Sequence, residues 1–184
     1  MIIRKEDIEE QKLYYIPLFK KKLFIHPTQN GYNIGCDARN EALVQKIRLV
    51  KHWQTHPFNV IAPNIEWIKQ HTQLPTEAYE HLPGDVTLIT HIKETSDLAH
   101  EVHLGTKIIG IRFPNHWMRT VVSRMGIPIV STCANRRAEQ LMTCIEQAHP
   151  DISAVADIII DEGTKKGCEP IFIDYTTHCN IVTE

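Results

Sequence analysis

The fold of this chain is constrained most strongly by residues 24–38, which read FIHPTQNGYNIGCDA. The apolar start predicts the end of a buried strand, and Pro27 then removes a donor from the ladder of hydrogen bonds. Gly31 and Gly35 allow backbone angles that other residues resist, so the polar residues between them predict a turn, with a helix beginning near Cys36. Strand ends of this kind carry the ligand sites of α/β proteins, although a surface turn after a core strand explains the stretch equally well.

The length and composition of the chain fit a soluble globular protein. Its 184 residues predict one domain over residues 1–184, and 42% of them are hydrophobic and 23% charged. The formal net charge of −2 gives no global electrostatic case for nucleic-acid binding and leaves a local basic patch open. No apolar run approaches the roughly 20 residues that span a bilayer, and the charged N-terminus lacks a signal-peptide core. We therefore expect a cytoplasmic protein without a membrane partner.

The cysteines and histidines form no recognisable framework of disulfides or metal ligands. The five cysteines are odd in number and no pair has CxxC spacing, which favours reduced thiols in a cytosolic protein. His52 and His56, and likewise His100 and His103, have ligand-like spacing without a second ligand pair. Surface histidines are the simpler interpretation, so no metal ligands are assigned.

Apolar periodicity predicts a mixed α/β domain in which helices and strands alternate. Helices are expected over residues 8–19, with a break near Pro17, and over residues 40–51, 64–70, 74–82, 114–125 and 138–148. Strands are expected over residues 23–26, 58–62, 86–92, 107–113, 127–132, 155–160 and 171–175, the last being the final strand. Residues 93–106 carry no strong period and are predicted to form a loop.

Basic residues occur in two different settings. Lys46, Arg48 and Lys51 lie in the C-terminal half of a predicted helix, where they suit the helix dipole, and the simplest interpretation is a charged outer face. Arg112 instead lies inside the apolar run KIIGIRF. An arginine buried in such a strand needs a partner or a ligand, because burying its charge alone is costly.

The strand expected at residues 127–132 runs directly into a short polar segment. This segment reads Cys133-Ala134-Asn135-Arg136-Arg137. Small and hydrogen-bonding residues followed by two arginines are typical of an anion-binding turn between a strand and a helix.

Five segments, taken together and in order, indicate a family. They are PTQNGYNIGCDA, LVKHWQTHPFNV, PGDVTLI, IGIRFPNHW and IPIVSTCANRRAE. In these segments the chain resembles the Sua5/YrdC/YciO family, whose members include threonylcarbamoyl-AMP synthases. The resemblance covers roughly residues 8–175.

The resemblance implies a fold and an activity. The fold would be a twisted mixed α/β sheet with flanking helices and a concave, positively charged ligand cavity. The family's enzymes use L-threonine, bicarbonate and ATP, with Mg²⁺, to make threonylcarbamoyl-AMP and pyrophosphate. The product serves the t6A modification at position 37 of tRNA. Further partners would be other proteins of that pathway and RNA, because several members were described as binding double-stranded RNA.

The resemblance also assigns site residues. The catalytic candidates are Lys51, Arg112 and Asn135, which would place cationic and polar groups around the triphosphate. The family motif PT-[DE]-T-x-Y-G-L-G is matched at Thr28, Tyr32 and Gly35. The substrate-binding candidates are Thr28, Tyr32, Gly35, Thr87, Ser131, Thr132 and Cys133.

Several positions depart from the family motifs: Gln29, Asn30, Asn33, Trp53, His56 and Cys133. Trp53 stands where the arginine of K-x-R is usual; it cannot carry the phosphate charge but could stack on a base. Cys133 is a weaker hydrogen-bond donor than the usual serine, and His56 is cationic only when protonated. The site is therefore expected to be less cationic than in an active synthase.

Three functions follow from this pattern. The first is an active or weakened threonylcarbamoyl-AMP synthase. The second is a diverged member that binds a nucleotide or double-stranded RNA without completing the reaction. The third is a related adenylation or carbamoylation of another acceptor.

Overall fold

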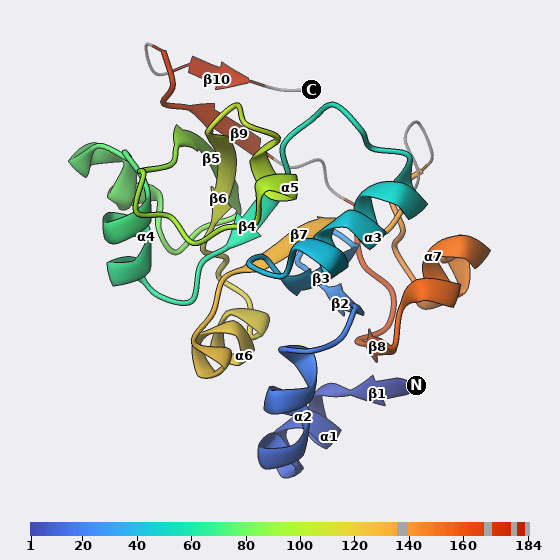
Figure 1. The fold of residues 1–184 in the computed structure, drawn as a ribbon. Helices are drawn as coiled ribbons and strands as arrows, with labels where there is room; N and C mark the ends of the chain where they lie inside the picture. The colour runs from blue at the N-terminus through green and yellow to red at the C-terminus, as the bar shows by residue number, and fades with distance from the viewer. Residues whose placement is uncertain (136–139, 168–170, 178–179, 183–184) are drawn as a thin grey trace.

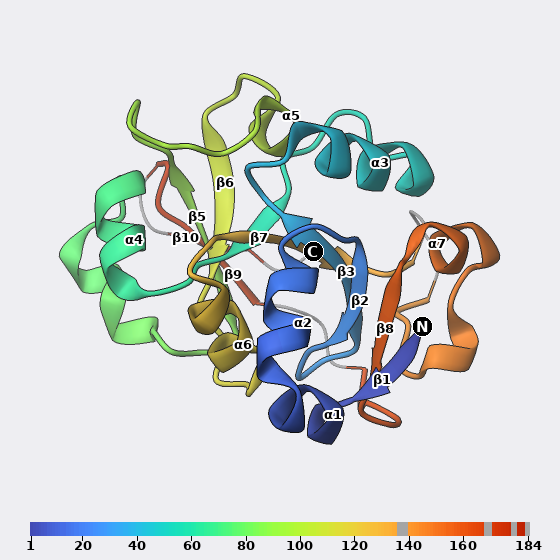
Figure 2. The ribbon, with the colours of Figure 1, turned by 60° about the horizontal axis from the view of Figure 1, so that its bottom comes forward.

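The computed structural model of the chain describes residues 1–135, 140–167, 171–177 and 180–182. Within these residues, ten strands form one mixed sheet in the order β1-β8-β2-β3-β7-β4-β6-β5-β9-β10. The sheet is twisted, and helices lie against both of its faces (Figures 1 and 2). The predicted α/β class, with a twisted mixed sheet and flanking helices, is confirmed.

The elements alternate along the chain much as the sequence predicted. The strands are β1 (Ile2–Arg4), β2 (Phe24–Pro27), β3 (Tyr32–Asp37), β4 (Asn59–Ile61), β5 (Val86–His91), β6 (Ile108–Arg112), β7 (Ile129–Cys133), β8 (Ile158–Asp161), β9 (Ile171–Asp174) and β10 (Asn180–Val182). The helices are α1 (Lys5–Glu10), α2 (Lys12–Phe19), α3 (Glu41–Lys51), α4 (Ile65–His71), α5 (His100–His103), α6 (Met118–Met125) and α7 (Pro150–Val155), with 3-10 helices η1 (Thr76–His81) and η2 (Ile145–Gln147). None of these helices has the length and apolar character needed to cross a bilayer.

Local sequence sets the ends of two helices on one face of the sheet. Asn40 precedes α3, and its side chain accepts a hydrogen bond from the amide of Leu43. Asn64 caps α4 in the same way through the amide of Trp67. At the other end of α3, His52 takes a left-handed φ of 53°, which ends the helix and turns the chain toward β4.

The stretch at residues 24–38 is a β-hairpin, and the helix expected near Cys36 was wrong. β2 pairs antiparallel with β3, placing Pro27 opposite Tyr32. β3 continues to Asp37 and pairs on its other side with β7. All six residues of β3 are buried, and a strand that is covered on both faces lacks the alternation that marks a strand in a sequence.

Two hydrophobic clusters cover the opposite faces of the sheet. One joins Phe19 of α2 to Phe24 of β2 and to apolar residues of α6. The other joins Ile47 of α3 to Ile25 of β2. Consecutive residues of β2 therefore belong to different clusters, as the alternation of side chains along a strand requires. Figure 2 shows α2 and α6 side by side on one face, away from α3.

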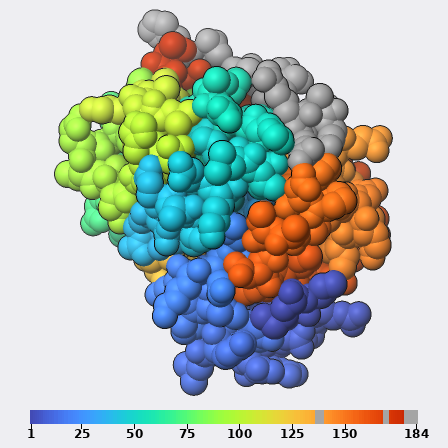
Figure 3. Space-filling view, turned by 45° about the vertical axis from the view of Figure 1, so that its right-hand side comes forward, coloured from blue at the N-terminus to red at the C-terminus, as the bar shows by residue number. Residues whose placement is uncertain are grey.

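The two ends of the described chain meet the sheet in ways the sequence did not predict. β1 pairs parallel with β8, and Figure 3 shows the dark-blue N-terminal segment lying against the orange segment that contains α7 and β8. β10 pairs antiparallel with β9, so the strand expected at 171–175 is not the last. Three-residue strands are too short to carry a periodic signal.

Three predictions for helices and loops were also wrong. The first helix is interrupted at Gln11, whereas Pro17 lies inside α2. Residues 93–106 contain α5, a helix of only four residues. Residues 138–139 of the helix expected at 138–148 lie outside the described residues, and in the rest of that range only η2 is helical. In that segment the carbonyl of Met142 accepts a hydrogen bond from the amide of Tyr32 at 2.9 Å, which holds it against the hairpin.

The expected charged outer face of α3 holds for Lys46 but not for Arg48 or Lys51, which are 5% and 1% exposed. Nη1 of Arg48 donates to the carbonyl of His56 at 3.0 Å, and its Nε lies 3.1 Å from the carboxylate of Glu101. The guanidinium thus ties α3 to α5 and to the segment that follows α3. A buried cation with several acceptors is stabilising only while they remain in place.

Replacing Arg48 with methionine should lower the free energy of unfolding by about 3–5 kcal/mol, because Glu101 and several carbonyls lose their donor. Lys46→Met, on the exposed face of the same helix, should change it by less than about 0.5 kcal/mol. Urea denaturation of the two variants measures the difference. Equal midpoints would show that the Arg48 contacts do not contribute to stability.

Candidate functional site

The end of β6 holds a buried arginine for which the described residues provide no partner. Arg112 is 8% exposed and its Nε is buried. Within the described part of the chain, no hydrogen bond or ion pair reaches its guanidinium. Burial lowers the pKa of Arg112, and nearby Cys133 and Asp85 oppose that shift. Since an unpaired buried charge is costly, Arg112 is a candidate for binding an anion. The apolar sequence around it had indicated that it needs a partner or a ligand.

Thr87 adds a second unpaired polar atom beside Arg112. β5 and β6 pair with Leu88 opposite Ile111, so continuing that register places Thr87 opposite Arg112. Oγ1 of Thr87 is buried and has no hydrogen-bond partner among the described residues. Two neighbouring polar groups that are buried and unpaired mark a place where a ligand would complete the hydrogen bonding.

Gly110 makes room for a further polar side chain next to this pair. A Cβ at Gly110 would lie 2.1 Å from Oδ1 of Asn59 and 2.6 Å from Cγ2 of Thr87. The amide of Asn59 therefore lies across the position that any larger residue at 110 would occupy. Asn59, Thr87 and Arg112 form a polar strip on the sheet.

His26, Ser131 and Asn33 form a hydrogen-bonded chain across β2, β3 and β7. Nδ2 of Asn33 donates to Oγ of Ser131 at 2.7 Å, and that oxygen lies 3.3 Å from Nε2 of His26. Nδ1 of His26 lies 3.1 Å from the carbonyl of Pro27. Burial lowers the pKa of His26 to about 4, and the charge of Arg112 contributes to the shift. These three side chains are therefore neutral at pH 7. The register of β7, β4 and β6 places Ser131 two residues from Ile129, which pairs with Ile61, the partner of Arg112.

Gly35 permits the close packing of these strands. A Cβ at this position would lie 2.5 Å from the carbonyl oxygen of Val130 and 3.4 Å from the ring of His26. The match of Gly35 to the family motif thus has a packing explanation in this structure.

Thr28 and Tyr32 hold the hairpin in place. Oγ1 of Thr28 donates to the carbonyl of Gly31 at 2.9 Å and accepts from its amide at 3.1 Å. The hydroxyl of Tyr32 donates to the carbonyl of Gly163 at 2.7 Å and accepts from the amide of Glu162 at 2.9 Å. Burial raises the pKa of Tyr32 to about 12. Both groups are engaged with the protein.

Lys51 brings the end of α3 to the end of β7. Its Nζ donates to the carbonyls of Cys133 and Asn135 at 2.5 Å and 2.6 Å. It also lies 5.5 Å from the centre of the Trp53 ring, which in turn lies 5.4 Å from the ring of His56. The structure thus groups the K-x-R and S-x-N segments.

The described part of the predicted anion-binding turn after β7 ends at Asn135. Nδ2 of Asn135 donates to the carbonyl of Gln140 at 3.3 Å, and no helix begins in described residues 140–144. Arg136 and Arg137 lie outside the described residues. Thr132 pairs with Ile34 across the sheet, so its side chain lies on the face opposite Ser131.

Sequence reasoning missed three residues at this site: His26, Asn59 and Glu162. The carboxylate of Glu162 accepts from Nε1 of Trp117 and from Nζ of Lys165, and it lies 3.1 Å from Nε2 of His116. It thereby joins the segment after β8 to the start of α6. A polar residue inside an apolar strand, the signal that identified Arg112, was also present at His26.

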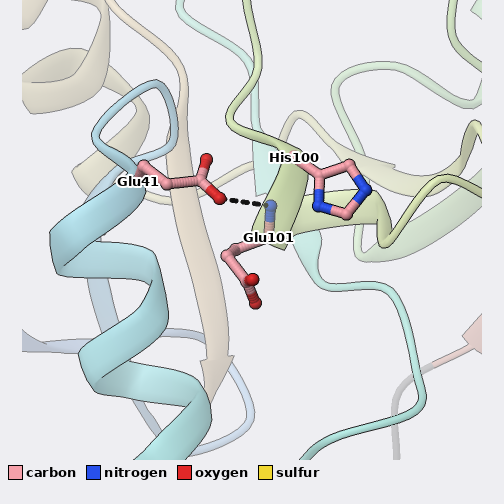
Figure 4. A group of neighbouring side chains, drawn as sticks. All are labelled: Glu41, His100 and Glu101. Atoms are coloured by element: carbon pink, nitrogen blue, oxygen red, sulfur yellow. Dashed lines mark hydrogen bonds between the residues drawn. The ribbon is translucent and has the colours of Figure 1, made fainter.

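One group of side chains has the spacing of metal ligands, but it lies away from this site. Glu41, His100 and Glu101 bring their ligand atoms within 4.8 Å of one another, where the start of α3 meets α5 (Figure 4). Glu41 is about 15 Å along α3 from Lys51, at 1.5 Å per residue. Among the described residues, no comparable group surrounds Arg112. No side-chain group among the described residues around Arg112 is therefore assigned to magnesium.

A pocket of about 760 Å³ lies over α4 and η1, lined by residues such as Ile65, Lys69 and Tyr79. It contains none of the candidate site residues. The structure thus groups the candidates around Arg112 and around Lys51 rather than in this pocket.

Comparison with known proteins identifies what the chain resembles. The Sua5/YciO/YrdC family model, described as telomere recombination, matches residues 18–182. The threonylcarbamoyl-AMP synthase of Idiomarina loihiensis is 24% identical over 160 residues, covering 82% of this chain and 85% of that protein. The Bacillus subtilis synthase is 28% identical over 153 residues, 79% of this chain and 44% of that protein. The carbamoyltransferase HypF of a Synechocystis species is 27% identical over 122 residues, 63% of this chain and 15% of that protein.

Solved structures share the fold. Sua5 of P. abyssi, complexed with L-threonine, superposes with a TM-score of 0.83 at 23% identity, covering 98% of this chain and 56% of that one. YciO of E. coli superposes with a TM-score of 0.81 at 19% identity, covering 100% of this chain and 94% of that one. The chain thus spans about half the length of the Bacillus and P. abyssi proteins.

Replacing Arg112 with methionine should leave the free energy of unfolding unchanged or raise it, because the variant removes a buried charge that no described side chain pairs. The same variant should lose binding of anionic ligands, measured with ATP and with threonine by calorimetry. Arg48→Met, the matched buried arginine with protein partners, should show the reverse. A destabilised Arg112→Met protein that binds normally would contradict the assignment of Arg112 to a ligand site.

Proposed function

Because the chain belongs to the Sua5/YciO/YrdC family, we propose that it is a threonylcarbamoyl-AMP synthase-like enzyme. It would make threonylcarbamoyl-AMP from L-threonine, bicarbonate and ATP for the t6A modification at position 37 of tRNA. The observation that carries the proposal is the buried pair Arg112 and Thr87. Nε of Arg112 and Oγ1 of Thr87 have no hydrogen-bond partner among the described residues, in a family whose curated relatives bear the synthase name.

The reaction asks for positioning and charge rather than for covalent help from the protein. The amine of threonine and bicarbonate form a carbamate and water; a carbamate oxygen then attacks the α-phosphorus of ATP, and pyrophosphate leaves. Arg112 would bind an anionic group of the substrates through its guanidinium. Lys51 would act through the backbone, since its Nζ holds the carbonyls of Cys133 and Asn135, and thus position the segment after β7.

The substitutions in the family motifs agree with a slow enzyme. Trp53 supplies an aromatic ring beside Lys51 where an arginine would supply a phosphate contact. Thr28, Tyr32 and Gly35 still match the family motif and pack within the hairpin. We therefore attribute the reduced activity to lost positive charge and not to a change in the hairpin. The RNA and protein partners of the t6A pathway, and a cytoplasmic location, remain part of this proposal.

A second candidate is transfer of a carbamoyl group to an acceptor other than threonine. Its support is the similarity to the carbamoyltransferase HypF of Synechocystis. Both candidates use the same anion-binding strip and differ in the acceptor.

Purified protein incubated with L-threonine, bicarbonate, ATP and a magnesium salt should form threonylcarbamoyl-AMP and threonine-dependent pyrophosphate, detected by mass spectrometry and a coupled assay. Arg112→Met is the control and should form neither. Intact ATP binding without either product would exclude the synthase. Pyrophosphate release with a different amine, but not with threonine, would favour the second candidate, whereas RNA binding that weakens steeply with salt would favour an RNA-binding role.

The double variant Trp53→Arg with Cys133→Ser restores two family residues and should raise the rate of pyrophosphate release, because a bidentate cation and a stronger donor return to the site. Thermal unfolding confirms that the variant folds. An unchanged rate in a folded variant would mean that these two positions do not limit the reaction.

A further inference from the structure

His26, Ser131 and Asn33 form a network of hydrogen-bonded side chains that is buried. Because it is buried, the positions of its hydrogen atoms can be deduced. His26 and Ser131 are 0% exposed and Asn33 is 3% exposed. None of the three can exchange a hydrogen bond with bulk water at low cost. Where two of these side chains meet, a donor must therefore face an acceptor.

The carbonyl of Pro27 determines which atom donates and which accepts in each hydrogen bond of this network. A carbonyl only accepts hydrogen bonds, so Nδ1 of His26, 3.1 Å away, must carry the hydrogen. A neutral imidazole has one N–H, which leaves Nε2 as an acceptor. The hydroxyl of Ser131 then donates to Nε2 across 3.3 Å. The neutral state of His26 agrees with its pKa of about 4, which burial lowers.

Asn33 is oriented as a consequence. Because the hydroxyl hydrogen of Ser131 is given to His26, Oγ of Ser131 can only accept from Asn33, and the group facing it at 2.7 Å must be Nδ2. A flipped amide would place two acceptors against each other. Oδ1 of Asn33 is thus turned away from Ser131, and it receives no hydrogen bond from the described residues.

The location of Asn33 suits its Oδ1 atom to accept a hydrogen bond from a ligand. Asn33 lies opposite Cys133, where β3 begins and β7 ends. Its partner Ser131 lies two residues from Ile129, and Ile129 pairs with Ile61, which pairs in turn with Arg112. An acceptor oxygen and an unpaired cation in one region complement a molecule that carries both a hydrogen-bond donor and an anionic group. Amino acids with a free amine or hydroxyl have that chemistry.

We propose that Asn33 is a specificity-determining residue whose Oδ1 accepts a hydrogen bond from the amine or hydroxyl of an amino-acid substrate, with His26 and Ser131 as positioning residues that fix the orientation of its amide. This inference rests on the proposed function in taking an amino acid as the acceptor. It goes beyond that function in assigning the recognition to a residue at which the chain departs from the family motif.

The binding test uses the full chain and needs no turnover. Threonine, serine and 2-aminobutyrate, which lacks the hydroxyl, are titrated by calorimetry into the unmodified protein and into Asn33→Leu, Asn33→Gly and the exposed control Asn115→Leu. Loss of one hydrogen bond should weaken amino-acid binding about tenfold in both Asn33 variants, while ATP affinity stays within about twofold. Asn115→Leu should bind like the unmodified protein. If the unmodified protein binds threonine more tightly than 2-aminobutyrate and the variants bind both equally, the hydroxyl of threonine is the donor. If the difference in affinity persists in the variants, the amine is the donor.

The outcomes separate the inference from the proposed function. Normal threonine affinity in a folded Asn33→Leu or Asn33→Gly protein overturns the inference and leaves the synthase standing. Failure of threonine alone, with serine or 2-aminobutyrate bound in an Asn33-dependent way, overturns the function and supports the inference. Absence of binding to all three overturns both.

A second measurement tests the positioning without any ligand. Nitrogen-15 NMR of the histidine rings at pH 7 should show His26 protonated at Nδ1 and not at Nε2. Ser131→Ala should leave that tautomer in place, because Pro27 still accepts from Nδ1, yet weaken amino-acid binding by releasing the amide of Asn33. The opposite tautomer or a charged ring in the unmodified protein would overturn the inference.

Discussion

The close approach of β2, β3 and β7 is the constraint on which the rest of the structure depends. Gly35 lies at the centre of these strands, where a Cβ would meet the carbonyl oxygen of Val130 at 2.5 Å. Only with the strands this close can the ring of His26 lie against β3 and the side chains of Asn33 and Ser131 meet. Both hydrophobic clusters take residues from these strands, so the polar chain is held by the same packing that holds the core.

The two buried arginines illustrate how a fold distinguishes structure from function. Arg48 and Arg112 are similarly buried, yet the first is surrounded by carbonyls and a carboxylate and the second by nothing that pairs with it in the described residues. The cost of burying a guanidinium is offset inside the protein in one case. In the other the described residues provide no such offset, which is the arrangement expected where affinity for a ligand is gained at the expense of stability.

The sequence predicted those parts of the fold and site that have a local signature. The apolar run around Arg112 predicted both a strand and a residue in need of a partner or a ligand, and the apolar spacing of residues 40–51 predicted α3. The hairpin was not predicted, because every residue of β3 is buried and Tyr32 and Asn33 bond to residues that are distant in the sequence. Lys51 and Arg48 were predicted to lie on an exposed helix face. Their burial could not be predicted, because the carbonyls that accept their hydrogen bonds come from other segments of the chain.

The strand order also has a consequence for how the chain must fold. β8 lies between β1 and β2, and β7 lies between β3 and β4. Each of these four early strands can therefore complete its pairing only after a strand much later in the sequence has been synthesised. The N-terminal amine itself reaches the carbonyl of Asp157, 156 residues away. Such distant pairings have a high contact order and form slowly. During synthesis β2 and β3 would lack their outer sheet neighbours until residues 129–133 and 158–161 had been made, and unpaired strand edges of this kind expose a chain to aggregation.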